Sequence, residues 1–308
     1  MAFFSIIIPL YNKENFIEST LKSVFSQTFT DFEIIVVNDG STDKSEEKVK
    51  QFKDSRIRYF AKENGGVSTA RNFGIEKSET QHITFIDADD YWFPNFLRVM
   101  FENINKYPEH KVFSACIEIE TSRKVIPAHY SIIKTNDCES VNFFEASLKQ
   151  PVLCTSCAVF HKSVFEKIGQ FDVDIKSGQD MDLWLRIGLV YPILFSWKIL
   201  ARYIDDANSL SKSQAVESGG VKFTKFIALE KTNPNLKRII DLNRFTIAIK
   251  CKLSGNHTLF KKYYNSIDTN NLSVKKRILL HLPAYVLKPL IGLKTFLANL
   301  GLGSSVFK

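Results

Sequence analysis

The stretch FSIIIPLY, residues 4–11, is a short apolar run without polar alternation. A strand of this kind is buried on both faces, as in a parallel sheet covered by helices. Three comparable runs follow, FEIIVVNDG (32–40), RIRYFA (56–61) and HITFIDAD (82–89), with helical segments between them. Strand and helix therefore alternate as far as residue 107, which predicts an open α/β sheet of parallel strands.

The helices are predicted from apolar spacing and from end signals. Residues 12–27 carry Ile17, Leu21 and Val24 at helical intervals, with Asn12 as the N-cap.

After residue 110 the pattern changes, because KVFSACIEIE (111–120) alternates and CTSCAVF (154–160) is typical of a strand. We therefore expect a mixed second half, a boundary near SQAVESGG (213–220), one domain over residues 1–220 and a helical extension over 221–308.

The charge of the chain is divided unequally. The net charge is +8, but residues 221–308 hold 16 Lys and Arg against 3 Asp and Glu, which gives +13 there and −5 in the rest. Such asymmetry indicates an anionic partner surface. The segment SVKKRILLHLPAYVLKPLIGLKTFLANLGL (273–302) mixes basic clusters with apolar residues, as an interfacial amphipathic segment does, and Pro283 and Pro289 are expected to break it into short helices. The alternative is that its apolar stripe packs on the domain formed by residues 1–220 or on a second subunit.

The ends of the chain and its cysteines bear on location. The first residues lack the basic flank and long apolar run of a signal peptide, and the apolar run 278–287 is too short to span a bilayer. Five scattered cysteines favour a reducing compartment. Cys154 and Cys157, three apart on a strand, would point to opposite faces, so we expect a buried pair and not a zinc or redox site. These features predict the cytoplasm, either free or at the inner face of the membrane.

Three carboxylates, Asp87, Asp89 and Asp90, lie within four residues of each other in ITFIDADDYW (83–92). Two unit charges about 5 Å apart repel by roughly 3 kcal/mol at an effective dielectric near 20. A divalent cation would relieve this repulsion, and Mg²⁺ is commonly held by one or two carboxylates together with substrate phosphates. The alternative is a solvated turn in which Asp90 caps the next helix.

Other polar residues also follow predicted strands. Tyr11 and Asn12 come after the first strand and Asp39 after the second. Ligands of open α/β sheets bind outside the carboxyl ends of the strands, so we expect these residues and the acidic cluster at one edge.

Five segments together, in order, resemble the family 2 glycosyltransferases of the GT-A fold: SIIIPLYNKENFI (5–17), EIIVVNDGSTD (33–43), ENGGVSTARNFGI (63–75), ITFIDADDYW (83–92) and GQDMDLWLR (178–186). The resemblance covers roughly residues 3–211. It implies a nucleotide-sugar site formed by Pro9, Tyr11, Asp39, Arg71 and Asp87, with Asp89 as metal ligand and Asp90 as a cap or support.

Individual positions allow both a binding and a structural interpretation. A carboxylate at Asp39 can accept the ring N–H of uracil or thymine, or the residue can simply serve a turn before Gly40. The fork of Arg71 suits a base carbonyl or a phosphate, or it can form a surface ion pair.

The second acidic site is GQDMDLW (178–184). Family members usually have Glu-Asp here, with the Asp as general base, whereas this chain has Gln179 in place of the Glu. Asp180 and Asp182 are about 200° apart on a helix, and Asp182 stands at i,i+4 to Arg186. This favours Asp180 as the base, with a helix N-cap as its alternative.

A further departure lies in RYIDDANSLS (202–211). Many relatives have an Arg and a His just after the Tyr, where this chain has Ile204 and Asp206. Asp206 is a candidate replacement ligand for the metal.

The resemblance implies metal-dependent, inverting transfer of a sugar from a nucleotide sugar, UDP-linked before dTDP-linked, to a saccharide or lipid-linked acceptor in polysaccharide biosynthesis, with Mg²⁺ or Mn²⁺. Two alternatives stay open. A nucleotidyltransferase would normally carry a Gly-rich loop after the first strand, and PLYNKEN has no glycine. A non-catalytic binding or scaffold protein would not need Asp180. An oligomer is compatible with the sequence, and nucleic acid is not an expected partner, because no binding motif is present.

Overall fold

The computed structural model describes residues 2–205 and 223–299, the last seven of them as backbone only. Asp206 and the expected boundary at residues 213–220 lie outside these ranges. Within the described residues the strands form one sheet in the order β3-β2-β1-β4-β9-β6-β10-β5, with β7 beside β6 and β8 beside β10. The strands are β1 (Phe4–Leu10), β2 (Phe32–Asn38), β3 (Ile57–Ala61), β4 (His82–Phe85), β5 (Tyr91–Trp92), β6 (Val112–Glu120), β7 (Val125–Pro127), β8 (Cys138–Val141), β9 (Ala158–His161) and β10 (Ile193–Ile204).

The first four strands are parallel, as predicted. Strand β1 pairs with β2 and β4, and β2 pairs with β3. The second half is mixed, also as predicted: β9 runs antiparallel to β4 and β6, while β10 is parallel to β6 and antiparallel to β5 and β8. The α/β, GT-A-like fold class expected from the sequence is therefore confirmed.

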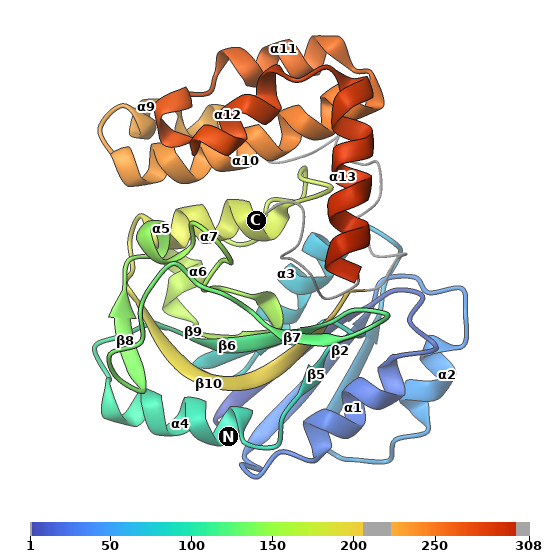
Figure 1. Cartoon of the computed structure of the whole chain (residues 1–308). Coiled ribbons are helices and arrows are strands. Elements are labelled where there is room, and N and C mark those ends of the chain that lie inside the picture. Colours follow the sequence, from blue (N-terminus) through green and yellow to red (C-terminus); the bar gives the residue numbers. More distant parts are fainter. Residues whose placement is uncertain (1, 206–222, 300–308) are drawn as a thin grey trace.

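Helices cover both faces of the sheet, as Figure 1 shows. Alternate side chains of β1 serve the two faces, because Ile6 and Ile8 lie in one core and Ile7 in the other. The first core is closed by α1 (Ile17–Phe25), α2 (Ser45–Lys50) and α4 (Phe96–Lys106), and the second by α3 (Val67–Lys77), α5 (Phe143–Ala146), α6 (Ser163–Ile168) and α7 (Gln179–Gly188). This arrangement explains the unbroken apolar runs.

The C-terminal extension adds a further helical layer over α5 and α7 (Figure 1). It consists of η3 (Phe223–Phe226), α9 (Ile227–Glu230), α10 (Pro234–Ser254), α11 (His257–Asn265), η4 (Thr269–Asn271), α12 (Val274–His281) and α13 (Ala284–Asn299). Asn233 caps the start of the long helix α10, since its side chain accepts a hydrogen bond from Leu236 N, and Gly255, with φ +82°, caps its end. Its residues Leu236, Ile239 and Ile240 belong to the same core as Trp184. Part of the extension's apolar surface is therefore buried in the core of the sheet-bearing part, residues 2–205.

Local predictions failed at three points. Helix α1 begins at Ile17, and Asn12 is not its N-cap: it has φ +50° and its side chain accepts from Thr42 N at 2.8 Å, which ties two loops together. Residues Thr155–Cys157 form a 3₁₀ turn, η1, before β9, so the strand geometry expected for the Cys pair is wrong. Pro283 separates α12 from α13 as predicted, whereas Pro289 lies inside α13.

Two further observations concern the cysteines and the helices. Burial raises the pKa of both the Cys154 and the Cys157 thiol, so both stay protonated near neutral pH. None of the helices in the described ranges is long and apolar enough to cross a membrane.

Candidate active site

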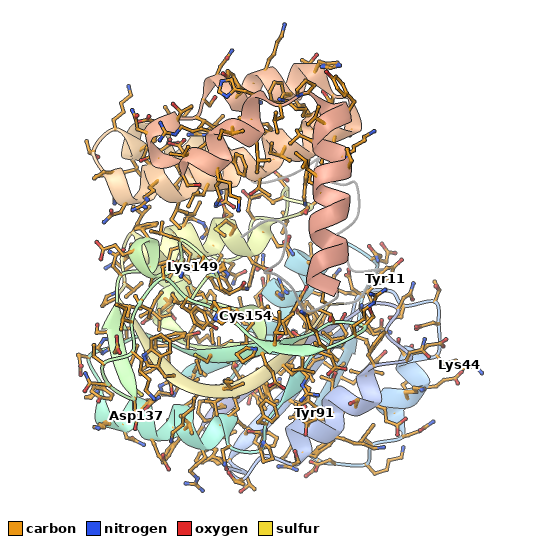
Figure 2. The ribbon with its side chains drawn as sticks, viewed as in Figure 1. Tyr11, Lys44, Tyr91, Asp137, Lys149 and Cys154 are labelled. Atoms are coloured by element: carbon orange, nitrogen blue, oxygen red, sulfur yellow. The ribbon has the colours of Figure 1, made fainter. Side chains whose placement is uncertain are left out.

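The predicted polar residues meet at the carboxyl edge of the parallel strands. Tyr11 directly follows β1, and Asp39 follows β2, where Asp39 N donates to Leu10 O at 2.8 Å. Tyr11 is 47% exposed and is labelled in Figure 2, while Pro9 is buried inside β1 opposite Val37. Asp87 follows β4, the neighbour of β1 on its other side.

Arg71, on the second turn of α3, connects two of the predicted carboxylates. Its side chain is 2% exposed, and it donates from Nη1 to Asp180 Oδ1 at 2.6 Å and from Nη2 to Asp87 Oδ1 at 2.7 Å. The guanidinium also lies 5.1 Å from the ring centroid of Phe171. The alternative of a surface ion pair is therefore wrong: Arg71 is a buried bridge between Asp87 and Asp180.

The environment of Asp180 suits a proton acceptor. Burial raises the pKa of the Asp180 carboxyl, Asp87 adds to the increase, and Arg71 opposes it. A carboxylate with a raised pKa is a stronger base than an ordinary Asp. The N-cap of α7 is Gly178, in a left-handed conformation, so the capping alternative for Asp180 is wrong.

Asp182 has a different environment. Its side chain is fully buried, accepts from Arg186 Nε at 3.0 Å and forms an ion pair with Lys225 of η3. The predicted i,i+4 pair with Arg186 is confirmed. Asp182 therefore ties α7 to the extension and does not contact the Arg71 bridge.

Asp89 has a partner that the sequence did not indicate. Lys13 Nζ lies 2.5 Å from Asp89 Oδ2. Burial and the neighbouring Asp87 raise the pKa of Asp89, and Lys13 lowers it. Lys13 thus offsets part of the negative charge around Asp89. The sequence position of Lys13, two residues after Tyr11, does not indicate this contact.

Asp90 supports the cluster from inside the protein. It accepts from Ser156 Oγ at 2.5 Å and from Ile204 N at 3.0 Å, and Ser156 Oγ in turn accepts from Asp87 N at 3.1 Å. Burial, Asp87 and Asp89 raise the pKa of Asp90 well above its usual range. Asn95, not Asp90, is the N-cap of α4, so the capping alternative is wrong and the supporting one holds.

Asp39 is buried and held from three sides. Gly66 N donates to it at 2.7 Å, Gly65 N donates at 3.1 Å, and the Lys62 ammonium contacts the same carboxylate. The next residue, Gly40, has φ +76°, a conformation that favours glycine, so a turn follows as expected. Asp39 is thus fixed in orientation at the end of β2.

Comparison with known proteins decides the family. Residues 5–169 match the sequence profile described as Glycosyl transferase family 2, which is more than half of the chain. The chain belongs to glycosyltransferase family 2. The resemblance deduced from the five segments is therefore confirmed, and the protein is a glycosyltransferase.

Relatives of this glycosyltransferase come from several bacteria. It is 32% identical over 229 residues to an uncharacterized glycosyltransferase of Rickettsia typhi, a match that covers 71% of each chain. It is 34% identical over 193 residues to the minor teichoic acid biosynthesis protein GgaB of Bacillus subtilis, which covers 58% of this chain and 20% of GgaB. The match spans less than half the length of several curated relatives.

Solved structures show the same fold. The crystal structure of S. aureus TarS 1–349 in complex with UDP-GlcNAc superposes with a TM-score of 0.61 at 19% identity, covering 90% of this chain and 78% of TarS 1–349. The overlap reaches beyond the family 2 segment at residues 5–169 and so includes part of the second half and of the extension.

The acidic cluster of this glycosyltransferase fits a cation that is shared with a substrate. No three His, Cys, Asp or Glu side chains gather as a ready metal site within residues 2–205 and 223–299. Asp87 and Asp89 nevertheless stand close enough to raise the pKa of Asp89, and two carboxylates plus phosphate oxygens are a common Mg²⁺ ligand set. Asp89, beside Asp87, would therefore suit a cation whose remaining ligands come from a substrate, and not one held in a closed protein cage.

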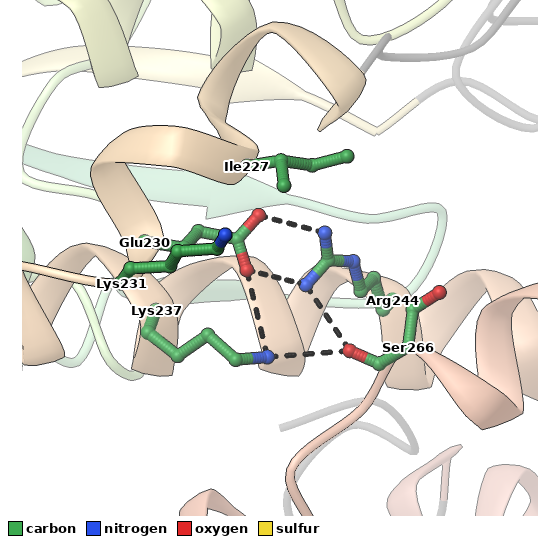
Figure 3. Close-up of a pocket in the computed structure, with 6 residues that line it drawn as sticks. All are labelled: Ile227, Glu230, Lys231, Lys237, Arg244 and Ser266. Carbon is green, nitrogen blue, oxygen red and sulfur yellow. Dashed lines mark hydrogen bonds and ion pairs between the residues drawn. The ribbon is translucent and has the colours of Figure 1, made fainter.

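A cavity in the extension has other properties. Ile227, Glu230, Lys231, Lys237, Arg244 and Ser266 line it (Figure 3). Arg244 makes two bonds to Glu230, at 2.6 and 2.7 Å, and Lys237 donates to Ser266 O at 3.2 Å. Glu230 also pairs with Lys237, and Lys237 has Asp241 as a further partner. These contacts join α9, α10 and the end of α11, so we interpret the cavity as part of a structural network.

Proposed function

We propose that this glycosyltransferase moves a sugar, with inversion of the anomeric carbon, from a UDP-sugar to a hydroxyl of a saccharide or lipid-linked acceptor in polysaccharide biosynthesis, and that it needs Mg²⁺ or Mn²⁺. The observation that carries the proposal is the Arg71 bridge, because it joins the donor-side Asp87 to the candidate base Asp180. The UDP-GlcNAc bound to TarS and the teichoic acid pathway in the name of GgaB support the donor and acceptor classes.

The nucleotide would lie over the edge formed by β1, β2 and β4. In this proposal Tyr11 and Pro9 line the base and ribose, Asp39 accepts from the base, and Asp87 contacts the ribose. Arg71 serves the nucleotide side as well: two of its donor groups hold carboxylates, whereas its buried Nε has no acceptor among the described residues.

Asp180 is the proposed general base. It takes the proton from the acceptor hydroxyl, whose oxygen forms a bond to the anomeric carbon while the bond from that carbon to the diphosphate oxygen breaks. Attack from the face opposite the leaving group turns an α-linked donor into a β-linked product. Asp89 would hold the cation, which when bound would offset the charge of the leaving diphosphate. Arg71 keeps Asp180 ionised and fixed in orientation.

Product analysis tests this function. The purified full chain would be incubated with UDP-, dTDP- and GDP-sugars, a panel of lipid-linked and free saccharide acceptors, and Mg²⁺, Mn²⁺ or a chelator. Mass analysis should show one added sugar only with a UDP donor and a cation, and NMR should show the inverted anomer. Nucleotide binding without any turnover would support a binding protein and contradict the proposal, and a retained anomer would contradict the role of Asp180.

We also propose that the basic extension, residues 221–308, holds the enzyme at the anionic inner face of the cytoplasmic membrane. Leu280 and Leu287 are buried in the extension's own core, but Val274, Ile278 and Tyr285 are 64%, 56% and 78% exposed. Lys275, Arg277 and Lys288 lie exposed among them. Each basic residue near an anionic leaflet contributes about 1 kcal/mol, so several acting together would give salt-sensitive binding.

Vesicle co-sedimentation of full-length variants tests the membrane proposal. Removing everything after residue 220 would take Leu236, Ile239 and Ile240 out of the shared core, so substitution is preferable to truncation. A triple Val274→Ser, Ile278→Ser, Tyr285→Ser variant should lose binding to phosphatidylglycerol vesicles at low salt. A control with exposed apolar residues of the sheet-bearing part, Ile133→Ser and Val173→Ser, should keep it. Equal binding to neutral vesicles, or unchanged binding of the triple variant, would contradict the proposal.

A further inference from the structure

Lys62 stands beside Asp39 at the end of β3. Its backbone N–H donates to Asn38 O at 2.9 Å, which extends the β2–β3 pairing by one residue and places Lys62 next to the proposed base-binding acid. The Lys62 ammonium contacts Asp39 Oδ1, Glu63 O at 2.6 Å and Thr69 Oγ1 at 3.1 Å. Its side chain is partly exposed, whereas Asp39 is buried beneath it.

The residues around the Lys62 ammonium are tightly packed. A Cβ at Gly65 would come within 2.7 Å of Thr69 Oγ1 and 3.1 Å of Lys62 Nζ, so a side chain at that position would displace the ammonium. Gly65 N and Gly66 N hold the two oxygens of Asp39 independently of Lys62. If the long, flexible Lys62 side chain turned away, Asp39 would keep its orientation and gain a free acceptor position towards solvent.

A ligand that displaces the Lys62 ammonium must offer Asp39 a hydrogen-bond donor in its place. Uracil and thymine present a ring N–H between two carbonyl oxygens along one edge. We propose that Lys62 is a specificity-determining residue for the base: the ring N–H takes its place on Asp39, and the displaced ammonium donates to a neighbouring ring carbonyl. This inference rests on the proposed function, since it assumes that the donor nucleotide lies against Tyr11 and Asp39.

The chemistry separates uracil from cytosine. Cytosine has an unprotonated ring nitrogen where uracil has its N–H, so in the same position it would face the Asp39 carboxylate with an acceptor and lose the hydrogen bond. A site built to bond a polar group discriminates strongly against an analogue that leaves the site unpaired. Cytosine can match Asp39 and Lys62 only when it is shifted by one ring atom, which would also displace the ribose from Asp87.

Sulfur-substituted nucleotides test the role of Lys62 directly. Isothermal titration calorimetry in the presence of Mn²⁺ would measure UDP, 2-thio-UDP, 4-thio-UDP and CDP with the unmodified chain and with Lys62→Met. A control, Lys50→Met, removes a surface lysine of α2 that pairs with Glu46 and lies over the Tyr59 ring, and that has no contact with Asp39 among the described residues. A hydrogen bond from a charged donor corresponds to about 10- to 100-fold in affinity.

The inference predicts how the affinities for these nucleotides change together. Lys62→Met should bind UDP about 10-fold or more weakly than the unmodified chain does. The unmodified chain should bind one of the two thio-nucleotides more weakly than UDP, because sulfur is a weak acceptor. This loss of affinity should vanish in Lys62→Met, which has no ammonium to donate. Binding of CDP should be weaker than that of UDP by a similar factor. The Lys50→Met control should behave like the unmodified chain.

Several outcomes overturn it. UDP binding that Lys62→Met leaves unchanged, or a thio penalty that persists in the variant, shows that Lys62 does not touch the base. If the variant does not fold, equal affinity of the unmodified chain for UDP and both thio-nucleotides overturns the inference without it. An unmodified chain that does not bind UDP refutes the proposed donor itself, which distinguishes that failure from a failure of the Lys62 proposal.

Discussion

Asp180→Asn and Asp182→Asn change two carboxylates that lie two residues apart on α7 but have different partners. Asp180 is paired with Arg71 at the edge of the sheet, and Asp182 is buried against Arg186 and Lys225. Each substitution preserves shape and removes one charge. If the site is assigned correctly, the first variant should lose turnover and keep stability, and the second should do the reverse.

The magnitudes follow from the contacts. Removing a general base costs about 10²- to 10⁴-fold in kcat. Arg71 keeps Asp87 as a partner in Asp180→Asn, so we expect a stability change of at most about 1 kcal/mol. Breaking a fully buried pair costs roughly 3–5 kcal/mol. In Asp182→Asn, Arg186 keeps three backbone carbonyl acceptors and Lys225 keeps Asp172. The two cations are also 19% and 33% exposed, so we expect about 2 kcal/mol, or roughly 3 °C in Tm for a chain of this length.

The assay combines single-turnover sugar transfer at saturating donor with thermal unfolding of both variants. Titration with UDP should give similar affinities for the unmodified chain and for Asp180→Asn. A dead Asp182→Asn enzyme beside an active Asp180→Asn enzyme would reverse the assignment. Loss of stability in both variants with full turnover in both would remove α7 from the catalytic mechanism altogether.

Four other results are expected. Asp89→Ala should abolish cation-dependent transfer and weaken Mn²⁺ binding measured by calorimetry while the chain stays folded, because it removes a crowded like charge; full activity in excess chelator would contradict this. Asp87→Ala should raise the Kd for the donor more than it lowers kcat, and an unchanged Kd would exclude the ribose contact. Since burial raises the pKa of Asp180, the acidic limb of the kcat/KM profile should lie above the ordinary Asp value of about 3.9, with activity lost as the pH falls through it. Arg71→Met should move that limb to still higher pH, because its positive charge favours ionised Asp180, and a limb at the same pH would show that Arg71 does not act on the base.

The sequence was informative where physical constraints are local. Ile6, Ile7 and Ile8 must be buried on both faces, and this alone predicted parallel strands under helices. Once the strands are parallel, residues that follow them share an edge, so Tyr11, Asp39 and Asp87 were placed correctly from their spacing. The i,i+4 geometry of Asp182 and Arg186 was equally local, and it was found.

Contacts between distant segments were not predictable in this way. The bonds from Lys13 to Asp89 and from Arg71 to Asp180 join residues 76 and 109 positions apart, and no periodicity connects them. Asn12 shows the opposite failure: its N-cap propensity is real, but a tertiary bond to Thr42 N holds it in a left-handed conformation instead. Charge composition separated the extension from the rest of the chain, while its Leu236 belongs to the same core as Trp184.

That shared core bears on how the chain folds as it is synthesised. Proteins emerge from the ribosome N-terminus first, and the sheet, complete by residue 204, is made before α10 at Pro234–Ser254. Until α10 arrives, the part of this core that Leu236, Ile239 and Ile240 later cover stays open at α5. The nascent glycosyltransferase therefore passes through a stage with an uncovered apolar face, in which a chaperone would protect it. A premature stop before α10 should yield aggregated chains and not a smaller active enzyme.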